Sequence, residues 1–330
     1  MRHIFIINPA AGKHRLACER VADIEAVFAE DTSLGTPEIV YTEEPGHATR
    51  IAKAYAESGD AVRLYACGGD GTIAEVLQGM YAYPNAQLAV LPCGSANDYV
   101  RTFPEHDFEN VAAVIHGDAH PVDLIACGER TSLNIACMGM DADVAAKMVK
   151  YKHWPLVTGP MAYNLAIVDV FFHRIGKTLS ITMQTPHGEV KREGRYFFAL
   201  AASGQYYGGG YHGAPMARPD DGMLDFVLVK AMSRIHVLSF LSKYKKGEFT
   251  DSPLCEHVRG TKMRVHCDEG AVVALDGECF SGTDISFALH NKPVAFVLPQ
   301  TTAVRQPVFD KNSGKTPAKK QLSGAFVKKL

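Results

Sequence analysis

The sequence predicts an N-terminal three-layer α/β domain followed by an antiparallel β-sandwich domain. In residues 1–123, strand-like apolar runs alternate with segments of helical spacing, which indicates a parallel sheet covered by helices. Residues 124–300 contain many short β-type runs separated by turns, which is typical of antiparallel sheets. A chain of 330 residues with 47% hydrophobic residues is long enough to form two such domains.

The elements of the first domain follow in order from the apolar pattern. HIFIIN at residues 3–8 predicts a buried strand, and apolar positions from Ala17 to Phe28 predict a helix over 15–30. The alternation continues with strands at 37–42, 62–67 and 87–92 and with helices at 46–57 and 72–80. Parallel strands of this kind place their functional loops at the carboxyl edge of the sheet.

The second domain is predicted from nine β-type runs and two helical interruptions. The interruptions lie at about 140–173 and 233–245, and the runs lie at 122–127, 131–137, 177–184, 195–203, 223–229, 262–267, 271–276, 284–290 and 294–299. We place the β-sandwich at 124–300 and a basic, flexible tail at 301–330, where residues 303–330 hold seven Lys or Arg and one Asp. A solvated tail is favoured over one that binds anionic membrane.

Composition excludes several classes of protein. The net charge of −2 is no argument for nucleic-acid binding, because proteins that bind nucleic acids usually carry a basic surface patch. The eight cysteines include no C-x-x-C pair and no zinc-like spacing, so we expect reduced core residues. The N-terminal apolar run is too short for a signal peptide, and no apolar window is long enough to span a membrane. We therefore expect a cytoplasmic protein that contacts membranes at most peripherally.

Three loops rich in glycine and small polar residues follow the predicted strands. They are NPAAGK at 8–13, CGGDGT at 67–72 and LPCGSAND at 91–98. A strand, a glycine turn and a helix N-terminus form an anion site, yet Asp70 in the second loop would repel a phosphate. The chain contains neither G-x-x-x-x-G-K-[ST] nor, at this loop, G-x-G-x-x-G. The second loop therefore needs an explanation other than these two phosphate-binding motifs.

In this order the three loops resemble the catalytic domain of diacylglycerol kinase-type lipid kinases, whose relatives include sphingosine kinases and, more distantly, NAD kinases. TEEPGHA at 42–48, VDL at 122–124, GGGYHGAPMARPDDGMLDFVLV at 208–229 and LDGE at 275–278 extend the resemblance to the small soluble bacterial members. The resemblance covers about residues 2–298. It implies the same nucleotide-binding α/β domain and β-sandwich that the apolar pattern predicts.

The resemblance implies sites for ATP and for Mg²⁺. ATP is expected to contact Asn8, Pro9, Gly12, Lys13, Thr42, Gly68, Gly69, Gly71, Thr72, Ser95 and Asn97. It assigns Glu278 as the base that accepts the proton of the acceptor hydroxyl, with Asp70 supporting the catalytic magnesium. It also implies a second, structural magnesium held by the Asp221 carboxylate and the backbone carbonyls of Arg218 and Met223.

These observations predict an ATP- and Mg²⁺-dependent lipid kinase that acts on a lipid hydroxyl at a membrane surface. Diacylglycerol is the preferred substrate, with sphingoid bases, phosphatidylglycerol or another lipid alcohol as alternatives, because the region 151–172 shows no readable specificity code. A kinase for NAD is favoured by GGDGT alone and disfavoured by the later motifs. An inactive lipid-binding regulator of the same fold is disfavoured by the presence of both Asp70 and Glu278.

Overall fold

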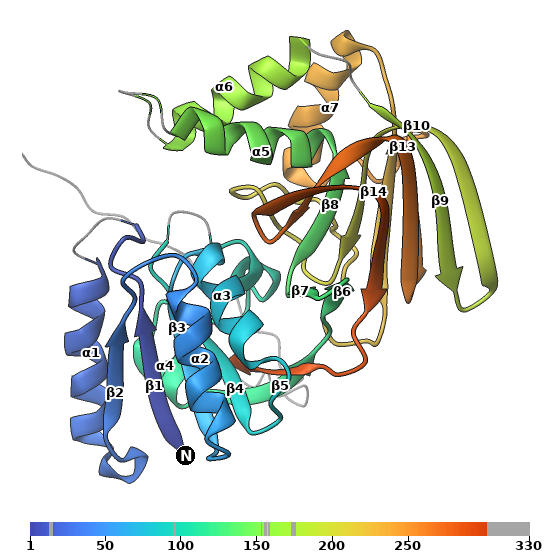
Figure 1. Ribbon diagram of the computed structural model, residues 1–330. Coiled ribbons are helices and arrows are strands. Elements are labelled where there is room, and N and C mark those ends of the chain that lie inside the picture. The colour runs from blue at the N-terminus through green and yellow to red at the C-terminus, as the bar shows by residue number, and fades with distance from the viewer. Residues whose placement is uncertain are drawn as a thin grey trace, which may run out of the picture. The chain divides into compact units, whose positions relative to one another are not determined.

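The computed structural model describes residues 1–12, 16–94, 97–152, 154, 157, 159–172 and 176–301. Residues 1–300 form one compact unit that contains two β-sheets (Figure 1). Lys13, Ser95 and the predicted tail after residue 301 lie outside the described residues.

The first sheet has the strand order β2-β1-β3-β4-β15-β5. Its strands are β1 (Arg2–Ile7), β2 (Pro37–Tyr41), β3 (Val62–Gly68), β4 (Ala86–Pro92), β5 (Asp118–Val122) and β15 (Val294–Leu298). The first five in spatial order run parallel, whereas β5 is antiparallel to β15 at the edge. The helices of this part of the chain are α1 (Leu16–Glu30), α2 (His47–Glu57), α3 (Asp70–Met80) and α4 (Val111–Ile115), with 3-10 turns η1 (Thr32–Leu34) and η2 (Tyr99–Thr102).

Alternate residues of the central strands face two separate cores. On β1, Ile4 and Ile6 pack with residues of α2 and α3, whereas Phe5 and Ile7 pack with residues of α1 and α4. A strand buried on both faces explains the uninterrupted apolar run in the sequence. The predicted three-layer α/β architecture is thus confirmed.

The second sheet is antiparallel and has nine strands. They are β6 (Ile125–Cys127), β7 (Arg130–Ser132), β8 (Ile135–Gly139), β9 (Lys177–Thr185), β10 (Gly188–Ala202), β11 (Leu224–Lys230), β12 (Cys255–Gly260), β13 (Lys262–Leu275) and β14 (Glu278–Leu289). β10 and β13 each pair with both β8 and β9, so these four strands close on themselves. One core lies within the closed sheet. A second core lies between the sheet and the helices α5 (Met140–Lys152), α6 (Gly159–Phe172) and α7 (Arg234–Lys246).

The structure corrects one predicted strand. The sequence pattern places VAFVLP in the β-sandwich, but its strand β15 pairs with β4 and β5 in the first sheet. The chain therefore returns to the first sheet after the antiparallel part. An apolar run of this length is compatible with either kind of sheet, and pairing over such a sequence separation leaves no local signal.

Candidate functional site

The three glycine loops meet at the carboxyl edge of the parallel sheet, as the sequence predicts. Asn8 follows β1, the chain turns at Gly69 between β3 and α3, and β4 ends at Pro92. The Asn8 side-chain amide donates a hydrogen bond to Thr72 Oγ1 at 3.0 Å. The Gly94 amide donates to the carbonyl of Gly68 at 3.1 Å. Backbone and side-chain contacts therefore hold the first loop to the second and the second to the third.

The glycines of these loops separate into two kinds. A Cβ on Gly12 would lie 2.1 Å from the Cys93 carbonyl oxygen, and one on Gly68 would lie 2.3 Å from Thr72 Oγ1. A Cβ on Gly94 would lie 2.4 Å from the Cα of Gly69. By contrast, a Cβ on Gly71 would meet no atom within 4 Å. The protein's own packing requires the first three glycines, whereas Gly71 leaves open space next to the first turn of α3.

Asp70 is the first residue of α3 and lies partly buried beside this open space. Its Oδ1 accepts a hydrogen bond from the Asp98 amide at 2.8 Å. Burial, followed by the negative charge of Asp98, raises the pKa of Asp70 to about 6. A carboxylate that is costly to ionise and lies at an open edge is suited to bind a cation, whose charge would offset the cost.

Asp98 is a second buried carboxylate at this edge. Its side chain accepts a hydrogen bond from the Gly209 amide at 2.7 Å and lies 3.6 Å from Arg101 Nε. Burial raises its pKa above the ordinary value. Its Oδ1 has no hydrogen-bond partner among the described residues. The LPCGSAND motif contained this residue, but its side chain had no assigned role, because its partner Gly209 comes from a distant loop.

Asp276 forms the tip of the β13–β14 hairpin together with Gly277, and both residues have positive φ, as is typical of an Asp-Gly hairpin turn. Its carboxylate accepts four hydrogen bonds, from the Ser132 hydroxyl and the backbone amides of Leu133, Asn134 and Ile135. Its charge also contributes to the raised pKa of Asp70. Asp276 thus anchors the hairpin that carries Glu278 to residues 132–135.

Glu278, the predicted base, begins β14 directly after this turn. Its side chain is 67% exposed and its Oε2 lies 4.0 Å from Arg130 Nη1. The Arg130 guanidinium lies over the ring of Phe280 at 4.6 Å. Within the described ranges, no hydrogen bond or ion pair joins Glu278 to Asp70. The structure leaves the Glu278 carboxylate accessible from the protein surface.

The remaining predicted ATP contacts also lie at or near the loop edge. Pro9 is exposed in the first loop, and the Thr42 amide donates to the carbonyl of Ile7 at 2.9 Å. Asn97 is buried with φ 50, and its side-chain amide donates to the Gly94 carbonyl at 3.3 Å. The Asn97 Oδ1 has no partner in the described part of the chain. Their contact with ATP stays a prediction.

At the predicted second magnesium site, the Asp221 carboxylate contacts another part of the protein. The Asp221 carboxylate forms an ion pair with Arg259, which also lies 3.6 Å from Asp225. The neighbouring Gly222 amide donates to Asp123 Oδ2 at 2.7 Å. Over the described residues, no three His, Cys, Asp or Glu side chains are grouped to hold a metal ion. Arg259 contacts Asp221 through Oδ2, and a magnesium site formed by Asp221, Arg218 and Met223 stays a prediction.

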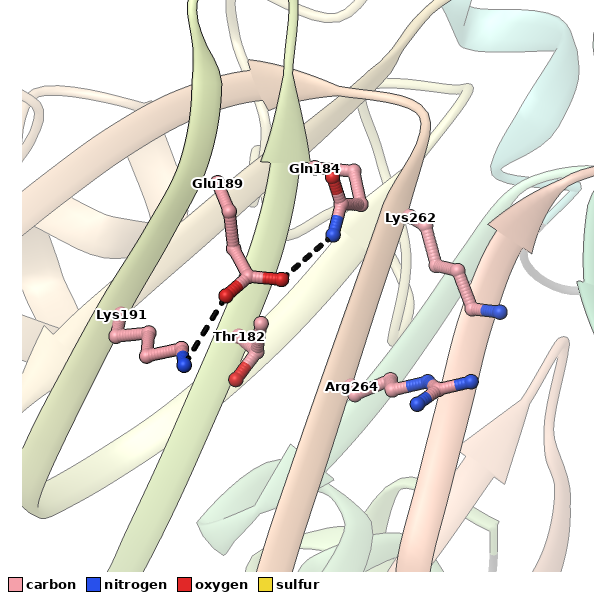
Figure 2. A pocket seen from close by; sticks show the side chains of 6 residues that line it. All are labelled: Thr182, Gln184, Glu189, Lys191, Lys262 and Arg264. Atoms are coloured by element: carbon pink, nitrogen blue, oxygen red, sulfur yellow. Dashed lines mark hydrogen bonds and ion pairs between the residues drawn. The ribbon is translucent and has the colours of Figure 1, made fainter.

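A polar hollow of about 380 Å³ lies elsewhere, on the outer face of β9, β10 and β13 (Figure 2). It is lined by Thr182, Gln184, Glu189, Lys191, Lys262 and Arg264. Glu189 accepts from Gln184 at 2.8 Å and lies 3.1 Å from Lys191. None of the predicted site residues lines it, so it is separate from the glycine-loop edge.

Comparison with known proteins gives the class that this fold and loop edge define. A family model for the diacylglycerol kinase catalytic domain matches residues 2–127. A model for the YegS C-terminal NAD kinase beta sandwich-like domain matches residues 134–301. The chain therefore belongs to the diacylglycerol kinase family of lipid kinases and is a kinase, as the sequence motifs predicted.

Individual relatives agree with this assignment. The chain is 30% identical over 271 residues to a probable lipid kinase YegS-like protein of Pseudomonas aeruginosa (strain UCBPP-PA14), with 81% of this chain and 86% of the relative covered. It is 27% identical to the diacylglycerol kinase of Bacillus subtilis (strain 168), covering 78% and 84%. The crystal structure of a diacylglycerol kinase from Bacillus anthracis str. Sterne shares the fold, with TM-score 0.67, 21% identity and coverage of 90% and 96%.

Proposed function

We propose that the protein transfers the γ-phosphoryl group of ATP to the hydroxyl of diacylglycerol, which gives phosphatidic acid. The observation that carries the proposal is Asp70, a carboxylate with a pKa raised to about 6 beside the open backbone of Gly71. This combination fits a phosphate chain that approaches a helix N-terminus with Mg²⁺ between it and the carboxylate.

The donor atoms at this edge fit Mg²⁺, because oxygen is its preferred ligand. Asp70 and Asp98 supply carboxylate oxygens. Asp98 Oδ1 accepts no hydrogen bond from the described residues and lies 3.6 Å from Arg101 Nε, which would share this oxygen with the cation. When bound, Mg²⁺ would neutralise charge on the transferred phosphoryl group. Asn8 and Thr72, already hydrogen-bonded to each other, hold the first two loops in place for the nucleotide.

Glu278 would accept the proton of the lipid hydroxyl while that oxygen forms its bond to the γ-phosphorus and the bond to ADP breaks. Its exposed position suits an acceptor that arrives from outside the protein. Asp276 positions it, because four hydrogen bonds fix the preceding turn. Transfer of this kind depends chiefly on positioning and charge stabilisation, so one carboxylate is a sufficient base.

The proposal is tested by incubating the protein with ATP, Mg²⁺ and separate acceptors, with transfer followed by radiolabel. The acceptors are detergent-dispersed diacylglycerol, sphingosine, phosphatidylglycerol and, in solution, NAD. Faster phosphorylation of diacylglycerol than of the others supports the proposal. Faster transfer to another lipid alcohol would replace diacylglycerol as the proposed substrate. Faster transfer to NAD would overturn the assignment as a lipid kinase. Absence of transfer to every acceptor would support an inactive lipid-binding regulator.

A further inference from the structure

Helix α6 exposes an apolar face that its position on the surface does not explain. Ala166 and Val170 are buried in the cluster shared with α5 and α7. On the other side, Met161, Leu165 and Val168 are 50%, 37% and 52% exposed. A helix that packs one stripe against a protein core normally places charged or polar residues on its outer stripe. We call Met161, Leu165 and Val168 the outer face of α6.

The one charged residue of α6 is Asp169, and its carboxylate contacts α5. Asp169 Oδ1 lies 2.9 Å from Lys147 Nζ, and its Oδ2 accepts a hydrogen bond from the Tyr151 hydroxyl at 2.8 Å. Both partners belong to α5, so the carboxylate is turned toward the neighbouring helix and neutralised there. The outer face of α6 therefore has no charge to keep it in water.

The adjoining segment has the composition of a membrane interface. Residues 144–168 contain three lysines and no Asp or Glu. Lys150 is exposed on α5, and Trp154, 52% exposed, packs edge-on against Tyr151 with ring centroids 5.1 Å apart. Lysines complement anionic lipid headgroups, and tryptophan favours the boundary between headgroups and acyl chains.

These helices are tied to the candidate site through a single strand. β8 begins at Ile135, whose amide donates to Asp276, and α5 begins at Met140 directly after β8. Five strand residues span roughly 17 Å. Figure 1 shows α5, α6 and α7 together at one end of the antiparallel sheet. A surface built from α5 and α6 is thus connected by a short, rigid path to the hairpin that carries Glu278.

We propose that the outer face of α6, with Trp154 and the exposed Lys150, docks onto an anionic phospholipid bilayer. The apolar side chains would enter the headgroup boundary while Lys150 contacts acidic headgroups. Charge complementarity favours this occupant over a second copy of the chain, whose matching face would carry the same positive charge. The inference rests on the proposed function in that a lipid kinase needs access to a bilayer.

The test is sedimentation of the full chain with phosphatidylcholine vesicles that contain or lack phosphatidylserine, without ATP, over a salt series. Leu165→Glu and, separately, Val168→Glu should each lower the partition coefficient about tenfold or more, because a carboxylate is poorly tolerated among acyl chains. Leu165→Met should bind within about twofold of the wild type, since it conserves volume and apolarity. His187→Glu adds a carboxylate at the exposed β9–β10 turn and serves as the control for charge.

Two readouts separate this proposal from its rivals. Vesicle binding by both glutamate variants at the wild-type level would overturn the proposal. The proposal would also fail if sedimentation velocity showed a dimer that these substitutions dissociate while vesicle binding is unchanged. Phosphorylation of a short-chain, monomeric diacylglycerol should be equal in wild type and Val168→Glu. Absence of that activity in the wild type, with vesicle binding still dependent on α6, would refute the proposed function and leave the docking surface standing.

Discussion

Replacing Asp70 by asparagine is expected to stabilise the nucleotide-free protein while it removes activity. The pKa of Asp70 is raised from 3.8 to about 6 by burial and by Asp98. One pKa unit corresponds to about 1.4 kcal/mol, so keeping Asp70 ionised at neutral pH costs the folded state roughly 3 kcal/mol. Asparagine removes that charge and keeps an oxygen that can accept the Asp98 amide.

The change in folding stability caused by Asp70→Asn depends on pH. For a carboxylate with a raised folded-state pKa, the protonated form stabilises the fold at pH values below the unfolded pKa, and this contribution is lost as pH rises through about 6. The gain from Asp70→Asn should therefore be full near pH 7.5, where the melting temperature should rise by ~5 °C. It should vanish near pH 3.5, where aspartic acid and asparagine are both neutral.

Thermal unfolding of both proteins over this pH range, followed by circular dichroism, is the assay. Added Mg²⁺ and ATP should stabilise the wild type more than Asp70→Asn, because the amide lacks the charge that attracts the cation. Loss of activity with a flat Mg²⁺ response confirms the metal role. Unchanged or lower stability of Asp70→Asn at pH 7.5 would refute the electrostatic reasoning and reduce Asp70 to a residue that starts α3.

Three further substitutions or deletions test other parts of the site. Glu278→Gln should leave ATP affinity nearly unchanged and lower turnover by ~100-fold or more in a phosphoryl-transfer assay, and turnover within threefold of wild type would exclude it as the base. Asp276→Ala should lower the free energy of unfolding by about 2–4 kcal/mol, because it leaves buried donors at the β7–β8 connection unpaired; a smaller loss in urea denaturation would contradict the anchoring role. Deletion of 303–330 should leave activity on detergent-dispersed lipid intact and weaken vesicle binding only at low salt, since each basic group contributes on the order of 1 kcal/mol. Loss of sedimentation at every salt concentration would instead identify the tail as the principal anchor.

The loop edge could be predicted because each motif is contiguous in sequence. NPAAGK, CGGDGT and LPCGSAND each follow a strand, and the parallel order of the strands brings their ends together. The resemblance of these motifs to lipid kinases drew attention to Asp70, and its role toward a cation stays a prediction. Local sequence carries these signals, so no tertiary contact had to be known.

The features that sequence reasoning missed depend on long-range contacts. Asp276 binds residues 141–144 positions away, and Asp98 binds Gly209, 111 positions away. No pattern near either aspartate predicts those partners. The pairing of Asp221 with Arg259 was also unforeseen, because the DDG segment gives no information about the strand that packs beside it.

The glycines of the loop edge provide a final test that separates packing from nucleotide binding. Gly71 lies inside α3 with open space at its Cβ position, so Gly71→Ala should stabilise the helix by about 0.5–1 kcal/mol. If phosphates approach this backbone, the same methyl group should weaken binding of a non-hydrolysable ATP analogue with Mg²⁺ about tenfold or more, as measured by titration calorimetry. Gly12→Ala is the contrasting variant, because φ of +65° and a Cβ 2.1 Å from the Cys93 carbonyl should destabilise the fold itself. Normal nucleotide affinity in a stabilised Gly71→Ala protein would place the phosphates elsewhere and remove the main support for the proposed ATP site.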